Sequence, residues 1–152
     1  MKKKLSLLLA LLMLASIAAL AACSKVEPIT VKVVINVAEE DDRGRREVTE
    51  TILETDFAYE SSTPTLNDLL VKLQDAGKIK LVTEADGDNV IVTGINDLVP
   101  KTDETETTME DYDWYVYIND GDAEDSSLSS TKAIAANDTV TITYMHYSIA
   151  KE

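Results

Sequence analysis

The chain has 152 residues, of which 28 are acidic and 14 are basic, and its formal net charge is −14 at pH 7. This charge argues against nucleic-acid binding, because nucleic-acid phosphates are bound by Lys and Arg, and against electrostatic adhesion to anionic lipid. The length allows one domain with its own core besides a targeting segment, and the single cysteine excludes a disulfide within the chain.

The N-terminus has the layout of a secretory signal. Lys2, Lys3 and Lys4 precede an almost uninterrupted apolar run over residues 5–22. The run ends in Leu20-Ala21-Ala22-Cys23, which resembles the end of a bacterial lipoprotein signal. That resemblance implies cleavage before Cys23, attachment of lipid to its thiol, and a protein held on the extracytoplasmic face of the cell membrane.

Two other interpretations of this segment compete with lipidation. A transmembrane anchor needs about 20 apolar residues, so the run is borderline in length, and ordinary signal cleavage would leave Cys23 as a free thiol. We favour lipidation because the sole cysteine stands where that chemistry needs it. The predicted organisation is a signal peptide over residues 1–22, a lipidated tether over 23–29 and one domain over 30–152. Without the signal the chain has 11 basic and 28 acidic residues and a formal charge of −17.

The domain opens with a predicted hairpin. Apolar residues alternate with polar ones over residues 30–37, which predicts a strand. Residues 38–46 are charged and contain Gly44, so they are predicted to form a loop, and residues 48–57 a second strand. Strand, loop and strand in this order indicate an antiparallel hairpin.

A helix is predicted next. Four leucines are spaced as one face of an amphipathic helix, namely Leu66, Leu69, Leu70 and Leu73. Thr65 is the predicted N-cap, and Gly77 is a natural stop. Such a leucine stripe is far more often core than binding surface.

The remaining elements are predicted to be strands. They cover residues 80–83, 89–95, 113–119 and 139–147, with a turn at 84–89 and an exposed, mobile loop over residues 96–111. This order predicts an α+β fold in which a mixed sheet packs on the single amphipathic helix.

Three motifs together carry a resemblance to a known family. They are Thr65-Leu66-Asn67-Asp68-Leu69-Leu70, Val92-Thr93-Gly94-Ile95-Asn96, and Trp114-Tyr115-Val116-Tyr117-Ile118-Asn119 followed by residues 137–144. They resemble the transcobalamin-like C-terminal domain family, which has small β-grasp-type domains. The sequence departs from the family where Asp120 separates Asn119 from Gly121, and where Asn137 replaces the usual glycine. The resemblance implies a β-grasp-like sheet, and binding of cobalamin or a related corrinoid for delivery to a membrane importer.

The candidate ligand-binding residues lie on the aromatic strand and the turn after it: Trp114, Tyr115, Tyr117, Asn119, Asp120 and Gly121. Tyrosine offers a flat apolar ring with a polar tip, which suits a planar ligand. Trp114 lies on the other face of the strand from the two tyrosines. It is therefore interpreted as a core residue or as a ligand contact, and both interpretations stay open.

Metal and catalytic sites have weaker support in the sequence. The acidic turns at residues 86–89 and 119–125 carry oxygen ligands that suit calcium, but neither fits a complete calcium-loop pattern. His146 is the only histidine, and no nucleophile-elbow motif surrounds the serines at 126–130. We therefore expect a non-enzymatic protein without a cofactor or metal. The alternative function is a surface interaction or accessory module that binds a protein or glycan.

Overall fold

The computed structural model describes residues 26–41, 43–87, 89–119, 121 and 127–150. The predicted signal peptide, Cys23 and Asp120 lie outside these residues. In the described part of the chain, no helix is both long enough and apolar enough to cross a membrane.

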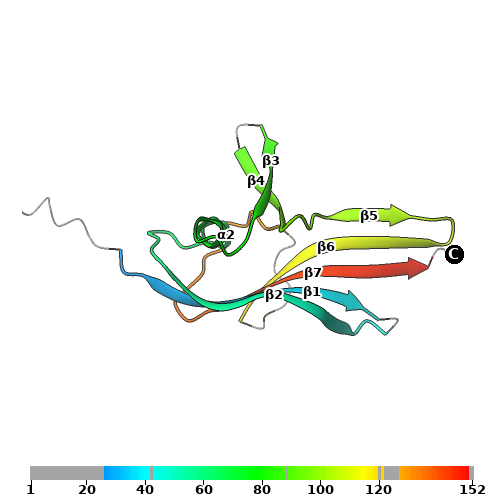
Figure 1. The fold of residues 1–152 in the computed structure, drawn as a ribbon, viewed down its shortest axis with the longest axis horizontal. Coiled ribbons are helices and arrows are strands. Elements are labelled where there is room, and N and C mark those ends of the chain that lie inside the picture. Colours follow the sequence, from blue (N-terminus) through cyan, green and yellow to red (C-terminus); the bar gives the residue numbers. More distant parts are fainter. Residues whose placement is uncertain (1–25, 42, 88, 120, 122–126, 151–152) are drawn as a thin grey trace, which may run out of the picture.

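The described residues form a mixed β-sheet with one helix, as the sequence predicts (Figure 1). A five-stranded sheet has the order β2-β1-β7-β6-β5, and β3 and β4 form a separate two-stranded sheet. The elements are β1 (Ile29–Glu40), β2 (Arg46–Tyr59), α2 (Leu66–Asp75), β3 (Leu81–Asp86), β4 (Asn89–Ile95), β5 (Lys101–Glu104), β6 (Thr108–Ile118) and β7 (Thr139–Ala150).

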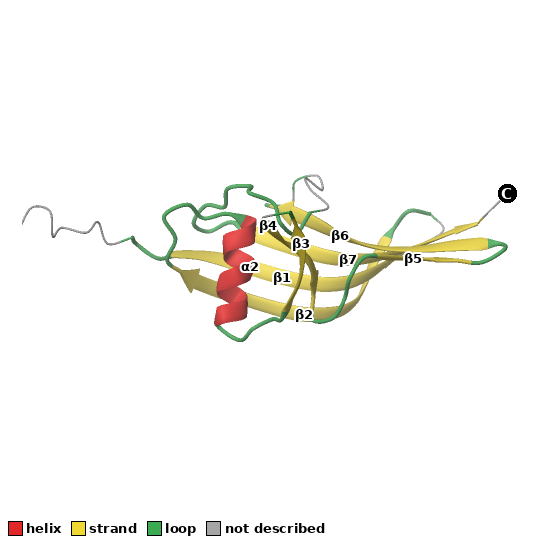
Figure 2. Cartoon of the chain, turned by 90° about the horizontal axis from the view of Figure 1, so that it is seen from above, coloured by secondary structure: helices red, strands yellow, loops and turns green. Residues whose placement is uncertain are grey.

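The centre of the large sheet is the parallel pair β1 and β7, and its other neighbouring strands are antiparallel. Val33 lies beside Val140 and Ile35 beside Ile142, and all four side chains belong to the core under α2. Figure 2 shows α2 lying across this face of the sheet. We call the opposite face, where side chains such as Asn36 and those of alternate residues point, the open face.

The helix begins and ends where the sequence predicts. Thr65 is the N-cap, and its Oγ1 accepts a hydrogen bond of 3.2 Å from the backbone N–H of Asp68. At the other end Gly77 has φ +67°, and the N–H of Lys78 donates to the carbonyl of Leu73 at 2.9 Å. A glycine in this conformation with this bond is a Schellman stop. The four leucines of the predicted stripe are almost completely buried.

The predicted loop over residues 96–111 is wrong, because it contains β5 and the beginning of β6. β5 is an edge strand that pairs only with β6, through Lys101 beside Tyr112 and Thr102 beside Asp111. An edge strand tolerates charged residues and exposed side chains on both faces. Its sequence therefore resembles a solvated loop, although its backbone is paired.

The hairpin of β3 and β4 stands away from the large sheet (Figure 1). β3 continues through residues 84–86, which were predicted from the sequence to form a turn.

Two contacts fix the position of β4. The backbone N–H of Val92 donates to Ser129 Oγ at 2.5 Å. Gly94 has no room for a side chain, because a Cβ there would lie 2.2 Å from the carbonyl oxygen of Leu98.

The helix packing predicts a large loss of stability for Leu69→Ala. The side chain is fully buried, and removing a buried leucine typically costs about 2–5 kcal/mol of unfolding free energy. Val71→Ala, on the same helix but 38% exposed, should change it by about 0.5 kcal/mol or less. Urea unfolding of both variants measures the difference, and similar losses would show that the leucine stripe does not hold the helix on the sheet.

Candidate functional site

The aromatic strand β6 divides its predicted site residues between the two faces of the sheet. Trp114 is only 1% exposed, belongs to the core under α2 and contacts the ring of Tyr144 at 4.9 Å. Tyr115 and Tyr117 are half-buried on the open face. The structure therefore brings the two tyrosines together and places Trp114 on the other side of the sheet.

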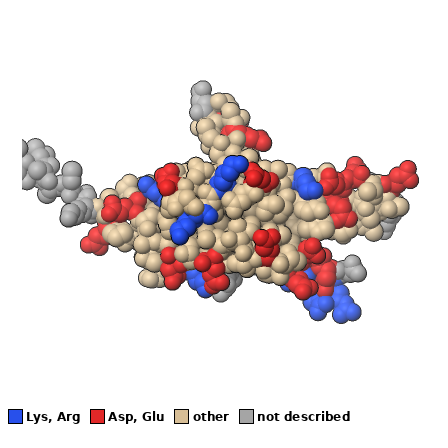
Figure 3. Space-filling model, in the orientation of Figure 1, with Lys and Arg blue, Asp and Glu red and all other residues tan. Residues whose placement is uncertain are grey.

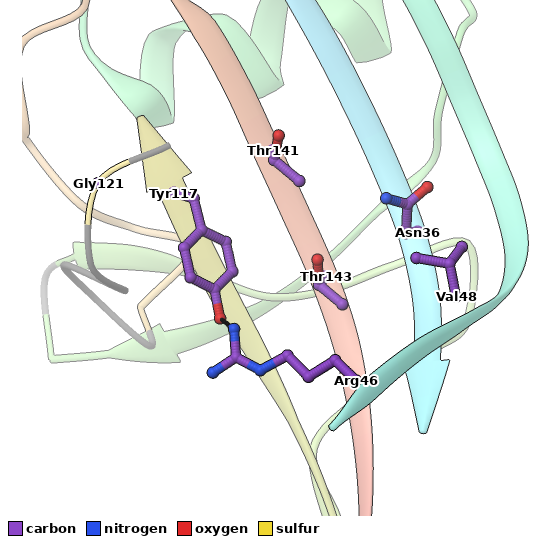
Figure 4. Close-up of a pocket in the computed structure, with 7 residues that line it drawn as sticks. All are labelled: Asn36, Arg46, Val48, Tyr117, Gly121, Thr141 and Thr143. Carbon is purple, nitrogen blue, oxygen red and sulfur yellow. Dashed lines mark hydrogen bonds between the residues drawn. The ribbon is translucent and has the colours of Figure 1, made fainter. Parts of the chain in front are cut away.

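A hollow of about 300 Å³ lies on the open face, and we call it the open-face hollow (Figure 4). Its lining consists of Asn36, Arg46, Val48, Tyr117, Gly121, Thr141 and Thr143. Two of the predicted ligand-binding residues, Tyr117 and Gly121, are among them.

The hollow exists because the β1–β2 hairpin bends toward the open face. Its register shifts between Ile35 and Asn36 and again between Val37 and Ala38, and such bulges bend and twist a strand. Figure 1 shows the end of the hairpin turning away from the side that carries α2. Ala38 and Met145, which lie side by side on the open face, are consequently buried.

Arg46, the first residue of β2, reaches over β7 to Tyr117 on β6 (Figure 4). Its guanidinium donates a hydrogen bond to the Tyr117 hydroxyl and lies 5.2 Å from the centre of that ring and 6.0 Å from the centre of the Tyr115 ring. These distances fall within the range of cation–π attraction. Tyr115 in turn contacts Tyr147 edge to face at 5.8 Å, so the guanidinium lies beside a cluster of three tyrosines.

Two tyrosines of this cluster, Tyr117 and Tyr147, have a raised pKa. Burial raises the pKa of Tyr117, and the Arg46 charge offsets part of that rise. Burial also raises the pKa of Tyr147, and its hydrogen bond with Tyr115 adds to the effect. No carboxylate of the described residues forms an ion pair with Arg46.

The hollow also contains a buried amide. Asn36 is 9% exposed, and its Oδ1 is buried without a hydrogen-bond partner among the described residues. It lies beside Thr143 in the β1–β7 register. A buried polar atom without a partner costs about 1–3 kcal/mol, and such atoms are rare in native proteins. The hollow therefore combines one guanidinium, neutral hydroxyls and an unsatisfied amide.

Asn119 has a structural role in the turn after β6. Its Nδ2 donates to Asp138 Oδ1 at 2.6 Å, and its Oδ1 accepts from the backbone N–H of Thr139 at 2.8 Å. Both ends of this amide are thereby engaged in joining β6 to β7, although we predicted Asn119 as a ligand contact. Asn137 has φ +69°, a left-handed conformation that glycine and asparagine tolerate best.

His146 lies on the other face of the sheet, away from the open-face hollow. Its Nε2 is 2.5 Å from Glu110 Oε2, and its ring stacks on Tyr112 at 4.4 Å. Ser148 Oγ donates to the other oxygen of Glu110 at 2.9 Å. The carboxylate lies between histidine and serine, whereas a nucleophilic triad needs the histidine in the middle. We interpret this cluster as a link between β6 and β7.

Five residues of the hollow were not predicted from the sequence: Asn36, Arg46, Val48, Thr141 and Thr143. The alternation of threonines with core residues along β7 places Thr141 and Thr143 on one face and is the only signal for them. No local sequence pattern points to Arg46, because its partner Tyr117 lies 71 positions away.

The acidic turns were also considered as calcium sites. The described residues contain no group of three or more His, Cys, Asp or Glu that could hold a metal ion.

Comparisons with known proteins give no family for this chain. No family model matches it, and no curated protein matches it significantly. Among solved structures it is similar to a "putative metal binding protein" from Ruminococcus gnavus ATCC 29149, with 14% identity and a TM-score of 0.35 over 78% of this chain and 95% of the other. A similarity at this level transfers neither a ligand nor a function.

The contacts of Glu110 with His146 and Ser148 predict how the stability of the fold changes as the pH falls. Hydrogen bonds from His146 and then Ser148 hold the pKa of Glu110 below its usual value. A depressed folded-state pKa stabilises the fold above the unfolded-state pKa of about 4.3, and this contribution is lost as the pH falls through the folded-state pKa. Glu110→Gln should therefore lower Tm at pH 7 and have a smaller effect at about pH 3.

Thermal unfolding at several pH values measures this dependence. Glu50→Gln, on the exposed part of β2, controls for the loss of one negative charge. A Tm difference between wild type and Glu110→Gln that is equal at pH 7 and pH 3 would contradict the assignment.

Proposed function

We propose that this protein is a lipid-anchored extracytoplasmic protein that binds a small molecule without catalysis, using the open-face hollow and the tyrosines beside it. Cobalamin or a related corrinoid is the candidate ligand, and a membrane importer is the candidate recipient. The observation that carries the proposal is the Arg46–Tyr117 contact. It joins the edge strand β2 to β6, across β1 and β7, into one surface with a flat aromatic base and a polar rim.

We also propose a β-grasp-type fold for the domain. The strand order β2-β1-β7-β6-β5, with a parallel central pair between the first and last strands, supports it. So does the single helix between the opening hairpin and the later strands. This arrangement agrees with the resemblance to the transcobalamin-like C-terminal domain.

The size and chemistry of the hollow set limits on its ligand. About 300 Å³ is at the low end for a small-molecule site. A large planar ligand would therefore lie over the hollow and the Tyr115 and Tyr117 rings, with only part of its rim entering. Aromatic rings support such contact through their flat apolar area.

The path of the chain keeps this surface near the proposed anchor. Residues 24–29, which lie between Cys23 and Thr30, span at most about 20 Å when fully extended. β1 begins at Ile29, and Val34, five residues along it, lies beside Thr141 of the hollow in the sheet register. Five strand residues span about 17 Å. A ligand on the open face would therefore lie close to the membrane surface.

The alternative function, a module that binds a protein, has support in β2. This strand has 14 residues and forms one edge of the large sheet. An edge strand presents unpaired backbone groups that an extended peptide can pair with. Its Glu47, Glu50, Glu54 and Asp56 favour a basic partner.

Replacing tyrosines on opposite faces of β6 tests the ligand site. Calorimetric titration with cobinamide should give saturable binding to the wild type. Tyr117→Ala should weaken it at least about tenfold, a loss of about 1.4 kcal/mol, because the aromatic base is removed. Tyr112→Ala, the matched change on the other face, should leave the affinity unchanged. No saturable heat with the wild type would reject the corrinoid, and equal losses in both variants would reject the site.

The anchor has its own test. In cells expressing the full chain, Cys23→Ser should move the protein from the membrane fraction to the soluble or secreted fraction. Stable anchoring needs more than one acyl chain, and the acidic domain adds no attraction to anionic lipid. Ser24→Ala is the matched control and should stay with membranes. Membrane retention of Cys23→Ser would indicate an uncleaved transmembrane segment instead.

A further inference from the structure

We infer that the outer edge of β2 over residues 53–59 is a docking site for an extended, basic segment of a partner protein, which adds to the large sheet as a further strand. This inference develops the alternative function by giving it a position on the molecule and a class of partner. It does not depend on the open-face hollow, so either site can fail without the other.

Residues 53–59 are the regular half of an edge strand. β2 is the last strand at its end of the large sheet, and its pairing with β1 runs without interruption from Tyr59 to Leu53. Among the described residues, no backbone group of β2 bonds to a backbone group outside β1. In an antiparallel pair, alternate residues direct their N–H and C=O groups away from the partner strand. This stretch therefore presents a row of backbone groups with which another strand can pair.

The two edges of the large sheet differ in their protection against such pairing. Proteins protect edge strands by shortness, proline, lysine or bulges. β5, at the other edge, has only four residues. Residues 53–59 contain no proline, glycine or lysine, and both register shifts of β2 lie before them. The β2 edge is therefore the one that can accept a strand of useful length.

The side chains of this stretch alternate between charged and apolar. Glu54 and Asp56 are exposed on the open face. Leu53 and Phe57 are half-buried on the α2 face, where they pack against the core. Lys32 forms an ion pair of 2.9 Å with Glu54, so one lysine of β1 faces two acids of β2. A strand that adds here meets acids on one face and apolar side chains on the other.

The charge of this edge selects the partner. β2 carries four acids and one arginine, and Figure 3 shows acidic side chains along the strip that β2 follows in Figure 1. A partner with Lys or Arg at every second position places these beside Glu54 and Asp56, and opposite charges on neighbouring strands stabilise their pairing. Apolar residues at the positions between them cover the α2 face of the stretch.

A second copy of this chain fits the same edge poorly. An antiparallel pair of β2 strands centred on Thr55 sets Glu54 of each copy opposite Asp56 of the other, and a centre one residue to either side sets one of these acids opposite itself. Like charges directly opposite each other destabilise a strand pair. The acids therefore oppose pairing between copies and leave the edge to a partner of opposite charge.

Two short peptides test the site, both acetylated and amidated at their ends, in which valine alternates with lysine or with glutamate. Each is titrated into the isotope-labelled protein, and amide hydrogen exchange is followed by NMR. The lysine peptide should slow exchange at alternate amides of residues 53–59, because new backbone hydrogen bonds form there. It should also bind at least about tenfold more tightly than the glutamate peptide, which brings like charges together.

A pair of variants checks that the acids of this edge are responsible. Asp56→Asn should weaken binding of the lysine peptide about two- to fivefold, the range of an exposed ion pair. Asp86→Asn removes the same charge from the β3–β4 hairpin, where Asp86 is exposed, and should leave the affinity unchanged. Equal effects of the two variants would show general attraction to an acidic protein and no site on β2.

Other outcomes would also overturn the inference. The lysine peptide could fail to bind, or bind without slowing exchange on β2, which would be electrostatic adhesion without strand pairing. Equal affinity for both peptides would show that charge does not select the partner. Slowed exchange on β2 without peptide, together with a dimer in sedimentation, would assign the edge to a second copy. None of these results bears on the open-face hollow, which the cobinamide titration tests.

Discussion

The parallel pairing of β1 with β7 is the constraint on which the rest of this fold depends. It places the first and last strands side by side at the centre of the sheet, so all other elements are arranged around a contact between the two ends of the domain. Val33, Ile35, Val140 and Ile142 point from this pair into the core under α2. Because side chains alternate along a strand, the same pairing fixes Asn36 and Thr143 as neighbours on the open face.

The open face acquires its shape from the irregular register of β1 with β2. The two register shifts bend the hairpin over β7 and carry Arg46 to Tyr117. The acids of this protein are spread over its visible surface (Figure 3). Arg46 lies near the Tyr115 and Tyr117 rings, with Glu40 opposite it in the β1–β2 register. The hollow therefore places one guanidinium among tyrosine rings in a protein whose net charge is negative.

Some of the predicted site residues line the hollow and others do not. Their contacts in the structure explain the difference. The alternation along β6 correctly separated Trp114 from Tyr115 and Tyr117, because a period of two is a property of the strand itself. Asn119 was placed correctly at the turn, but its amide is used by Asp138 and Thr139. Only the paired backbone of β6 and β7 shows that this side chain is committed to the fold.

The sequence alone determined the local elements, since their signals come from neighbours in the chain. The Thr65 cap and the leucine stripe of α2 depend on interactions within a few residues, and both are found as predicted. The tertiary structure decided that residues 101–104 form an edge strand and that Arg46 meets Tyr117. Strand pairing, register and bulges join segments far apart in the chain, and no short stretch of sequence encodes such a contact.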